Sequence, residues 1–158
     1  MTSRVMVAMR VPGPPERAFR VFTDDIGLWW RPNQLFQVTP RGPGVLAFET
    51  AGEGGPRWLV ERSAGGQVFV IGEVSVWAPG ERLVFAWRQA GFTDDQTTAV
   101  EVRFEAAGDQ TRVTVEHTGW DSLPAEHVAR HRFPDQVFNL RLAEWWRDLL
   151  EALAERVR

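Results

Sequence analysis

The stretch TTAVEVRFEAAGDQTRVTVEHTGW, residues 97–120, decides the fold class because apolar and polar side chains alternate on both sides of one turn. The residues that share its apolar face are Thr98, Val100, Val102 and Phe104 in the first arm, and Val113, Val115 and His117 in the second. Successive side chains of a strand point to opposite faces of a sheet. The stretch therefore predicts an antiparallel hairpin with one buried face and one wet face.

Short strands separated by glycine-rich turns continue on the N-terminal side of this hairpin. They are predicted at GVLAFET (44–50), PRWLVER (56–62), QVFVIGEVSVW (67–77) and ERLVFAWR (81–88). A further strand, RVMVAMRV (4–11), places Val5, Val7, Met9 and Val11 on one face. The pattern predicts an antiparallel sheet of about six to seven strands.

Helical periodicity appears after the first strand and again at the C-terminus. Pro14 and Pro15 can open a short helix, a second one should hold Trp29 and Trp30, and residues Thr23 to Asp25 should cap it. The long helix is expected from about 135 to 157, with an apolar stripe of Phe138, Leu142, Trp145, Trp146, Leu149, Leu150 and Leu153. A sheet with one apolar face and one long helix predicts an α+β fold in which a curved sheet grips that helix.

Composition bounds the rest of the interpretation. The chain has 158 residues, which suits a single domain over 1–158, and its formal net charge is −3. Dispersed arginines in a mildly acidic chain do not predict nucleic-acid binding. Cysteine is absent, so disulfides and thiolate sites are excluded. We find no signal-peptide pattern and no bilayer-length apolar run, so we expect a cytoplasmic protein without membrane insertion.

Three stretches in order resemble one known family: VPGPPERAFRVFTDDIGLWW (11–30), GEVSVWAPGERLVFAW (72–87) and the hairpin at 97–120. They are similar to the START-like, helix-grip superfamily also called SRPBCC, and within it to the activator of heat-shock-ninety ATPase homologues. The resemblance implies a cavity between sheet and long helix. Relatives bind lipids, hormones or polyketides, and a few catalyse cyclisations or hydrolyses. The C-terminal region departs from the family in its length and in its tryptophans.

Inward-facing aromatic and apolar residues are the candidate ligand-binding residues of that cavity. They are Trp29, Trp30, Phe48, Trp58, Val74, Phe85, Trp87, Val102, Phe104, Val115, His117, Phe138, Leu142, Trp145 and Trp146. In each adjacent tryptophan pair, one ring is expected in the core. The other ring lines the cavity or its mouth, faces a dimer partner, or completes the core.

Few residues point to catalysis or to a metal. His117 is interpreted as a core histidine with a hydrogen-bond partner, as a ligand-orienting group, or as a catalytic base. His127 and His131 have a spacing that metal ligands use on a helix, yet we favour surface histidines. Glu49 and Glu73 are expected to be solvated or paired. No catalytic residue, metal or cofactor is assigned.

Three functions remain open at this level. The favoured hypothesis is a binding protein for a small hydrophobic or aromatic molecule, with a homodimer left open. The first alternative is a small-molecule enzyme of the cyclase or hydrolase kind in the same cavity. The second is a domain that contacts a chaperone, as the family name suggests.

Overall fold

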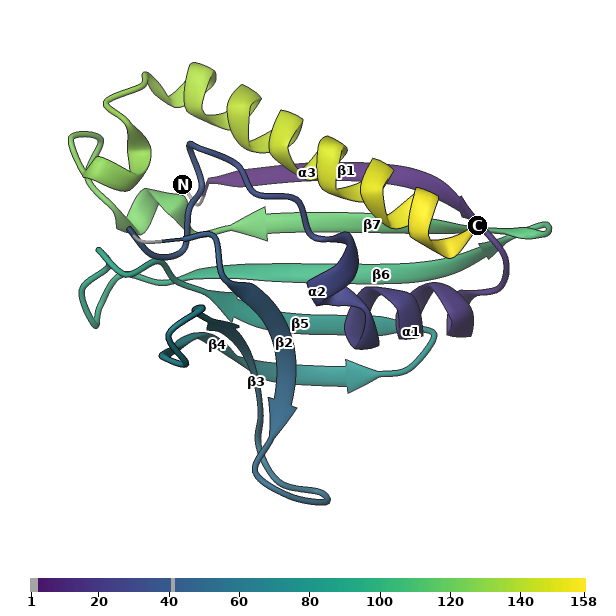
Figure 1. The fold of residues 1–158 in the computed structure, drawn as a ribbon. Helices are drawn as coiled ribbons and strands as arrows, with labels where there is room; N and C mark the ends of the chain where they lie inside the picture. The colour runs from purple at the N-terminus through teal and green to yellow at the C-terminus, as the bar shows by residue number, and fades with distance from the viewer. Residues whose placement is uncertain (1–2, 41) are drawn as a thin grey trace.

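A computed structural model describes residues 3–40 and 42–158. One antiparallel sheet has the strand order β1-β7-β6-β5-β4-β3-β2, and the long helix α3 lies across it (Figure 1). The strands are β1 (Arg4–Pro12), β2 (Val45–Thr50), β3 (Arg57–Arg62), β4 (Val68–Ala78), β5 (Arg82–Trp87), β6 (Thr98–Ala107) and β7 (Gln110–Thr118). The helices are α1 (Pro15–Asp24), α2 (Ile26–Trp29) and α3 (Asp135–Val157), with 3-10 turns at Trp120–Ser122 and Val128–Arg130. The predicted helix-grip architecture is confirmed.

The hairpin that predicted the fold has the expected register. Val102 faces Val115 and Val100 faces His117 across β6 and β7, and all four side chains are buried. His117 also lies opposite Val5 of β1. The imidazole therefore sits on the inner face at the middle of three paired strands.

The sheet bends at β4, which carries β3 and β2 away from the plane of the other strands (Figure 1). The pairing register shifts on both sides of β4, between Leu59 and Val60 and between Val74 and Val76. Gly72 lies at the bend, and a Cβ there would stand 1.9 Å from the carbonyl oxygen of Ala86. Irregular pairing increases local twist, and only glycine permits this approach of β4 to β5.

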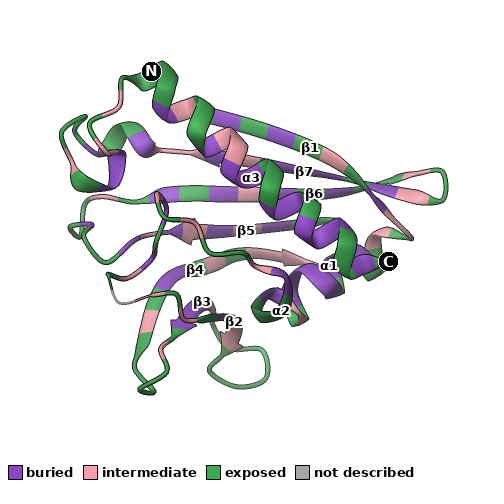
Figure 2. Cartoon of the chain, turned by 45° about the horizontal axis from the view of Figure 1, so that its top comes forward, coloured by how far each residue is buried: buried purple, intermediate pink, exposed green. Residues whose placement is uncertain are grey.

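Helix α3 buries one side against the sheet and exposes the other, as the alternating colours of Figure 2 show. The predicted apolar stripe is confirmed, since each of its members is at most 2% exposed: Phe138, Leu142, Trp145, Trp146, Leu149, Leu150 and Leu153. Burial of such side chains stabilises a fold by about 1.5–3 kcal/mol each. The core therefore lies between α3 and the inner face of the sheet.

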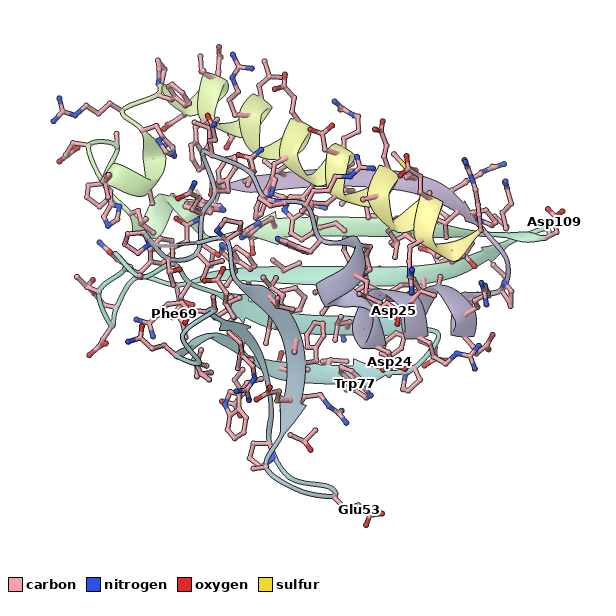
Figure 3. All side chains as sticks on the ribbon, in the orientation of Figure 1. Asp24, Asp25, Glu53, Phe69, Trp77 and Asp109 are labelled. Carbon is pink, nitrogen blue, oxygen red and sulfur yellow. The ribbon has the colours of Figure 1, made fainter. Side chains whose placement is uncertain are left out.

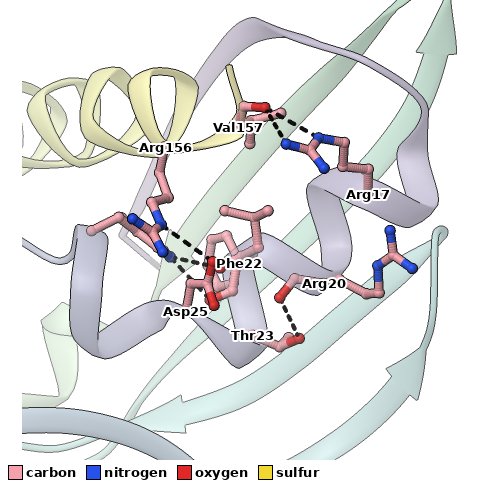
Figure 4. A network of polar contacts seen from close by, with 9 residues as sticks. Arg17, Arg20, Phe22, Thr23, Asp25, Arg156 and Val157 are labelled. Atoms are coloured by element: carbon pink, nitrogen blue, oxygen red, sulfur yellow. Dashed lines mark hydrogen bonds and ion pairs between the residues drawn. The ribbon is translucent and has the colours of Figure 1, made fainter.

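The helix pair α1–α2 is fastened to the end of α3 (Figure 4). Arg17 donates from Nε and Nη2 to the carbonyl oxygen of Val157, at 3.1 and 2.8 Å. Arg156 donates to the carboxylate of Asp25 at 3.2 Å. Asp25 stands at the N-cap position of α2 but makes no side-chain cap there, so the expected capping role is replaced by this ion pair. The contacts hold α1 and the start of α2 against the end of α3; Trp29 ends α2 and Trp30 follows it.

Within the described residues, no helix is long and apolar enough to cross a bilayer.

Candidate functional site

Most of the predicted cavity residues surround the core between the sheet and α3. The buried ones are Trp29, Phe85, Trp87, Val102, Phe104, Val115, His117, Phe138, Leu142, Trp145 and Trp146. Trp30, Phe48 and Val74 are partly buried and pack against the same core. Their role in holding a ligand stays a prediction.

Trp58 lies on the other face of the sheet, so its place in the predicted set is corrected. Its β-sheet partners are Glu49 and Glu73, and Glu73 is exposed. The fully buried Leu59 beside it occupies the inner face. Trp58 and Leu59 are both apolar, so alternation alone did not reveal which of them faces inward.

Of the first tryptophan pair, Trp29 lies in the core and Trp30 lines the cavity wall. The Trp29 indole N–H donates to the carbonyl oxygens of Val21 and Phe22 at 3.1 and 3.2 Å, which anchors this ring in the core. Trp30 does not belong to the helix as predicted; it follows α2 in an extended conformation with φ −63° and ψ 127°. This turn of the backbone directs the two adjacent rings to different places.

Trp30 lies among four other indoles, one of which is its neighbour Trp29 with centroids 5.5 Å apart. Its ring stacks on Trp87 with centroids 5.7 Å apart, and it makes edge-to-face contacts with Trp145 at 5.8 Å and Trp146 at 5.7 Å. Offset and edge-to-face pairs of this kind add about 0.5–1.5 kcal/mol beyond their buried area. Trp30 thus connects the sheet, the end of α2 and the long helix.

Both rings of the second pair lie in the core. Trp145 is 2% exposed and Trp146 is fully buried, so neither can form the dimer surface that was one alternative. Trp145 stacks on Phe36 with centroids 4.7 Å apart. Its indole N–H, like that of Trp87, has no acceptor among residues 3–40 and 42–158.

His117 is enclosed by hydrogen-bonding groups. Trp146 donates to its Nδ1 at 3.0 Å, Trp120 points its N–H at Nε2 at 3.2 Å, and the hydroxyl of Thr98 lies 2.8 Å from Nε2. Burial lowers the pKa of His117 to about 3, because the charged ring would lose its hydration. A neutral imidazole has one acceptor nitrogen, so only one of the two indoles is satisfied at a time. The expected partner of this core histidine is therefore found.

A cavity of about 50 Å³ lies beside Trp30, where α2, the segment from residue 31 to 44 and the strands β2 and β3 meet. The residues that line it are Gly27, Trp30, Pro32, Asn33, Phe36, Gln37, Val38, Gly42, Pro43, Gly44, Leu46 and Glu61. Such a volume has room for a few water molecules. Its walls are mainly apolar, with three polar side chains, which is the usual chemistry of a small-molecule site.

Gly44 brings the chain close to β3 at this cavity. A Cβ on Gly44 would stand 2.5 Å from the carbonyl oxygen of Arg62 and 2.8 Å from Cγ of Glu61. The missing side chain therefore lets residues 42–44 form a wall directly against Glu61.

Glu61 is the polar residue that the sequence analysis missed. It is 5% exposed, and the hydroxyl of Thr39 donates to its Oε1 at 2.6 Å. No second hydrogen bond or ion pair to this carboxylate is present within the described part of the chain. Its β-sheet partner Leu46 is buried in the core cluster, which places Glu61 on the inner face. A missed signal was its parity with Leu59 in PRWLVER.

The other polar candidates have structural roles. His127 accepts from the Ala129 N–H at Nδ1, and its Nε2 lies 3.1 Å from the Gly91 carbonyl oxygen. His131 contacts the Leu35 carbonyl oxygen and has φ 56°, so the two histidines do not share a helix face. Both are partly buried rather than simply on the surface.

Acidic side chains elsewhere do not converge on a site. Glu49 pairs with Arg62, as expected, and Figure 3 shows Glu53 and Asp109 at the tips of the β2–β3 and β6–β7 hairpins. Over residues 3–40 and 42–158, no three His, Asp or Glu side chains are grouped in a way that could hold a metal ion.

Sequence comparison matches residues 12–157 to a family model described as "Activator of Hsp90 ATPase homolog 1-like protein". No curated protein is significantly similar to the chain.

Many solved structures are similar in fold. Protein MLL2253 from Mesorhizobium loti is 17% identical with a TM-score of 0.61, over 98% of this chain and 96% of that one. Mll3558 from Rhizobium loti is 23% identical with a TM-score of 0.56, over 99% and 97%. CalU16 from Micromonospora echinospora is 16% identical with a TM-score of 0.61, over 99% and 75%. At these identities the likeness establishes the fold alone.

Proposed function

The chain belongs to the family of activator of Hsp90 ATPase homolog 1-like proteins, and from the cavity beside Trp30 we propose that it binds a small apolar molecule, of a size that about 50 Å³ admits. The observation that carries the proposal is the composition of the walls. Trp30 and Phe36 are aromatic lining residues, Val38 and Leu46 are aliphatic ones, and Glu61 is a single buried anchor. Pockets for small molecules combine such walls with a few placed polar groups.

Binding is supported over catalysis by the placement of the titratable groups. His117, the one residue considered as a base, is fully buried beneath Trp146 and Trp120 and has its pKa lowered to about 3. A general base works best with a pKa near the operating pH and within reach of its substrate. Among the described lining residues, Glu61 is the one titratable side chain, so an acid–base pair is not assembled there.

The first experiment is native mass spectrometry of the purified protein, followed by analysis of the molecules released on denaturation. In parallel, ethanol is titrated into isotopically labelled protein while the tryptophan indole N–H signals are followed by NMR. The proposal expects saturable shifts at Trp30 and at the amides of Gly27 and Gly44, because these residues line the cavity.

Two matched variants locate the binding. Trp30→Leu removes an aromatic wall of the cavity and should weaken ethanol binding at least fivefold. Trp58→Leu removes a ring of similar size from the other face of the sheet and should leave binding within twofold. A protein that carries no co-purified molecule and shows no saturable shift would contradict the proposal.

A further inference from the structure

The buried carboxylate of Glu61 differs from three other carboxylates of the sheet. Glu49, Glu101 and Glu116 each pair with an arginine, and their side chains are 34%, 17% and 21% exposed. Glu61 is only 5% exposed, and its contact within the described residues is the hydroxyl of Thr39. The least hydrated of these carboxylates is thus the one without a described cationic partner.

Burial of such a carboxylate is energetically unfavourable unless other groups compensate it. A carboxylate withdrawn from water needs hydrogen bonds or an opposite charge to compensate the lost hydration. One neutral hydroxyl compensates only part of it, since hydrogen bonds and ion pairs from charged donors are stronger than neutral ones. The side chain lines the cavity beside Trp30 and also borders the neighbouring hollow between Thr39 and Phe69. A molecule in the cavity can therefore reach it.

The rest of the lining favours a cation over an anion. No arginine or histidine is among the described residues that line either hollow, so an anionic ligand would meet a carboxylate without a compensating charge. Trp30 and Phe36 are aromatic residues that line the same cavity, and aromatic rings attract cations. Charge and ring chemistry point to the same ligand class.

We propose that the ligand of this site is a small amine, protonated at neutral pH, whose ammonium group pairs with Glu61 while its short apolar body lies beside Trp30 and Phe36. This inference rests on the proposed function and specifies the substrate class of the same cavity. Gly44 contributes by allowing the 42–44 wall to press against Glu61, which keeps the carboxylate shielded from water.

The test compares three probes of nearly equal shape that suit a cavity of about 50 Å³: ethylamine, ethanol and propanoate. Their dissociation constants are measured by NMR titration at neutral pH and low salt. The proposal expects the amine to bind at least tenfold more tightly than the alcohol, and the carboxylate to bind more weakly than the alcohol. Added salt should weaken the amine and leave the alcohol unchanged.

Glu61→Gln preserves the shape of the side chain and removes its charge. It should weaken the amine at least tenfold and change the alcohol less than threefold. Glu49→Gln, on the neighbouring strand, neutralises a half-buried carboxylate that is paired with Arg62 and should change neither. Thermal unfolding checks that both variants are folded. Should Glu61→Gln fail to fold, Thr39→Val keeps the carboxylate, removes its hydroxyl partner and should retain or strengthen the preference for the amine.

The outcomes separate the two levels of the proposal. Failure of all three probes to bind would contradict the cavity function itself. Saturable binding of the alcohol without any preference for the amine would overturn only the assignment of the amine.

Arg41 lies outside the described residues, so Arg41→Ala completes the series. A preference for the amine that appears only in this variant would also overturn the assignment, because the carboxylate would then be held within the chain.

Discussion

The indole N–H of Trp146 donates to Nδ1 of His117 across 3.0 Å, and this bond joins the long helix to the central strands of the sheet. In the tautomer that accepts this bond, the ring proton lies on Nε2 and is donated to the hydroxyl of Thr98 at 2.8 Å, while the Trp120 N–H is left without its acceptor. That hydroxyl donates in turn to the carbonyl oxygen of Trp87 at 2.8 Å. A continuous polar chain therefore crosses a core that is otherwise apolar.

Acid should destabilise the fold through His117. Its pKa is about 3 when folded and 6.5 when exposed, so between these values the unfolded chain binds a proton that the folded chain does not. The free energy of unfolding then falls as the pH falls, by up to about 1.4 kcal/mol per pH unit. Urea denaturation of the wild type and of His117→Gln from pH 7 to pH 4 measures the difference. A parallel loss of stability in both proteins would refute this role.

The two adjacent tryptophans of α3 should respond differently to loss of their N–H groups. Trp146→Phe removes a donor that is bonded to His117 and should lower the free energy of unfolding by about 2–3 kcal/mol. Trp145→Phe removes a similar volume but a donor without a described acceptor, so its cost should be at least about 1 kcal/mol smaller. Denaturant titration of both variants makes the comparison, and equal costs would argue against the polar chain.

Gly72→Ala should be among the most damaging small substitutions. Its Cβ would meet the backbone of Ala86 at 1.9 Å, and main chain cannot rotate aside as a side chain can. We expect a loss of about 3 kcal/mol or more, or failure to fold. Gly65→Ala is the matched control, because the nearest atom to its Cβ would be 3.9 Å away; its effect should stay within about 0.5 kcal/mol. Thermal and urea unfolding report both.

Arg17→Ala should loosen the end of the long helix. The guanidinium group donates to a carbonyl of the last turn of α3. A positive charge at this end of a helix also interacts favourably with the negative end of the helix dipole. We expect a loss of about 1 kcal/mol, with faster amide hydrogen exchange confined to the last turn of α3 and to α1. Arg20→Ala removes an exposed arginine of the same helix and should change stability by less than about 0.5 kcal/mol. Indistinguishable exchange in the two variants would count against the cap.

The fold was predictable because its periodicities are long and unmixed. The β6–β7 hairpin alternates over two full strands, and the stripe of α3 continues from Phe138 to Leu153. In those patterns the apolar residues could be assigned to the buried face and the polar residues to the solvent face. Alternation failed where both sides were apolar, as at Trp58 and Leu59, and this ambiguity also concealed Glu61 on the inner face.

The candidate site was less predictable because it depends on backbone irregularities. Trp30 reaches the cavity because the chain leaves α2 in an extended conformation at that residue. His131 adopts φ 56°, which is not a helical conformation. The four-residue spacing from His127 therefore does not place the two histidines on one helix face, as a metal site would need. The wall at Gly44 and Glu61 brings together segments that are separate in the sequence. None of these features has a repeating signature that a single sequence reveals.

The stacking of Trp30 on Trp87 gives the protein an optical reporter of its own. Two indoles held face to face couple their electronic transitions, and the sign and size of the resulting circular dichroism depend on their mutual orientation. Trp30 is a wall of the cavity, and Trp87 is buried on a strand of the sheet. Any molecule that tilts Trp30 therefore changes the ultraviolet spectrum, and occupancy becomes visible without a dye, a label or an engineered chromophore.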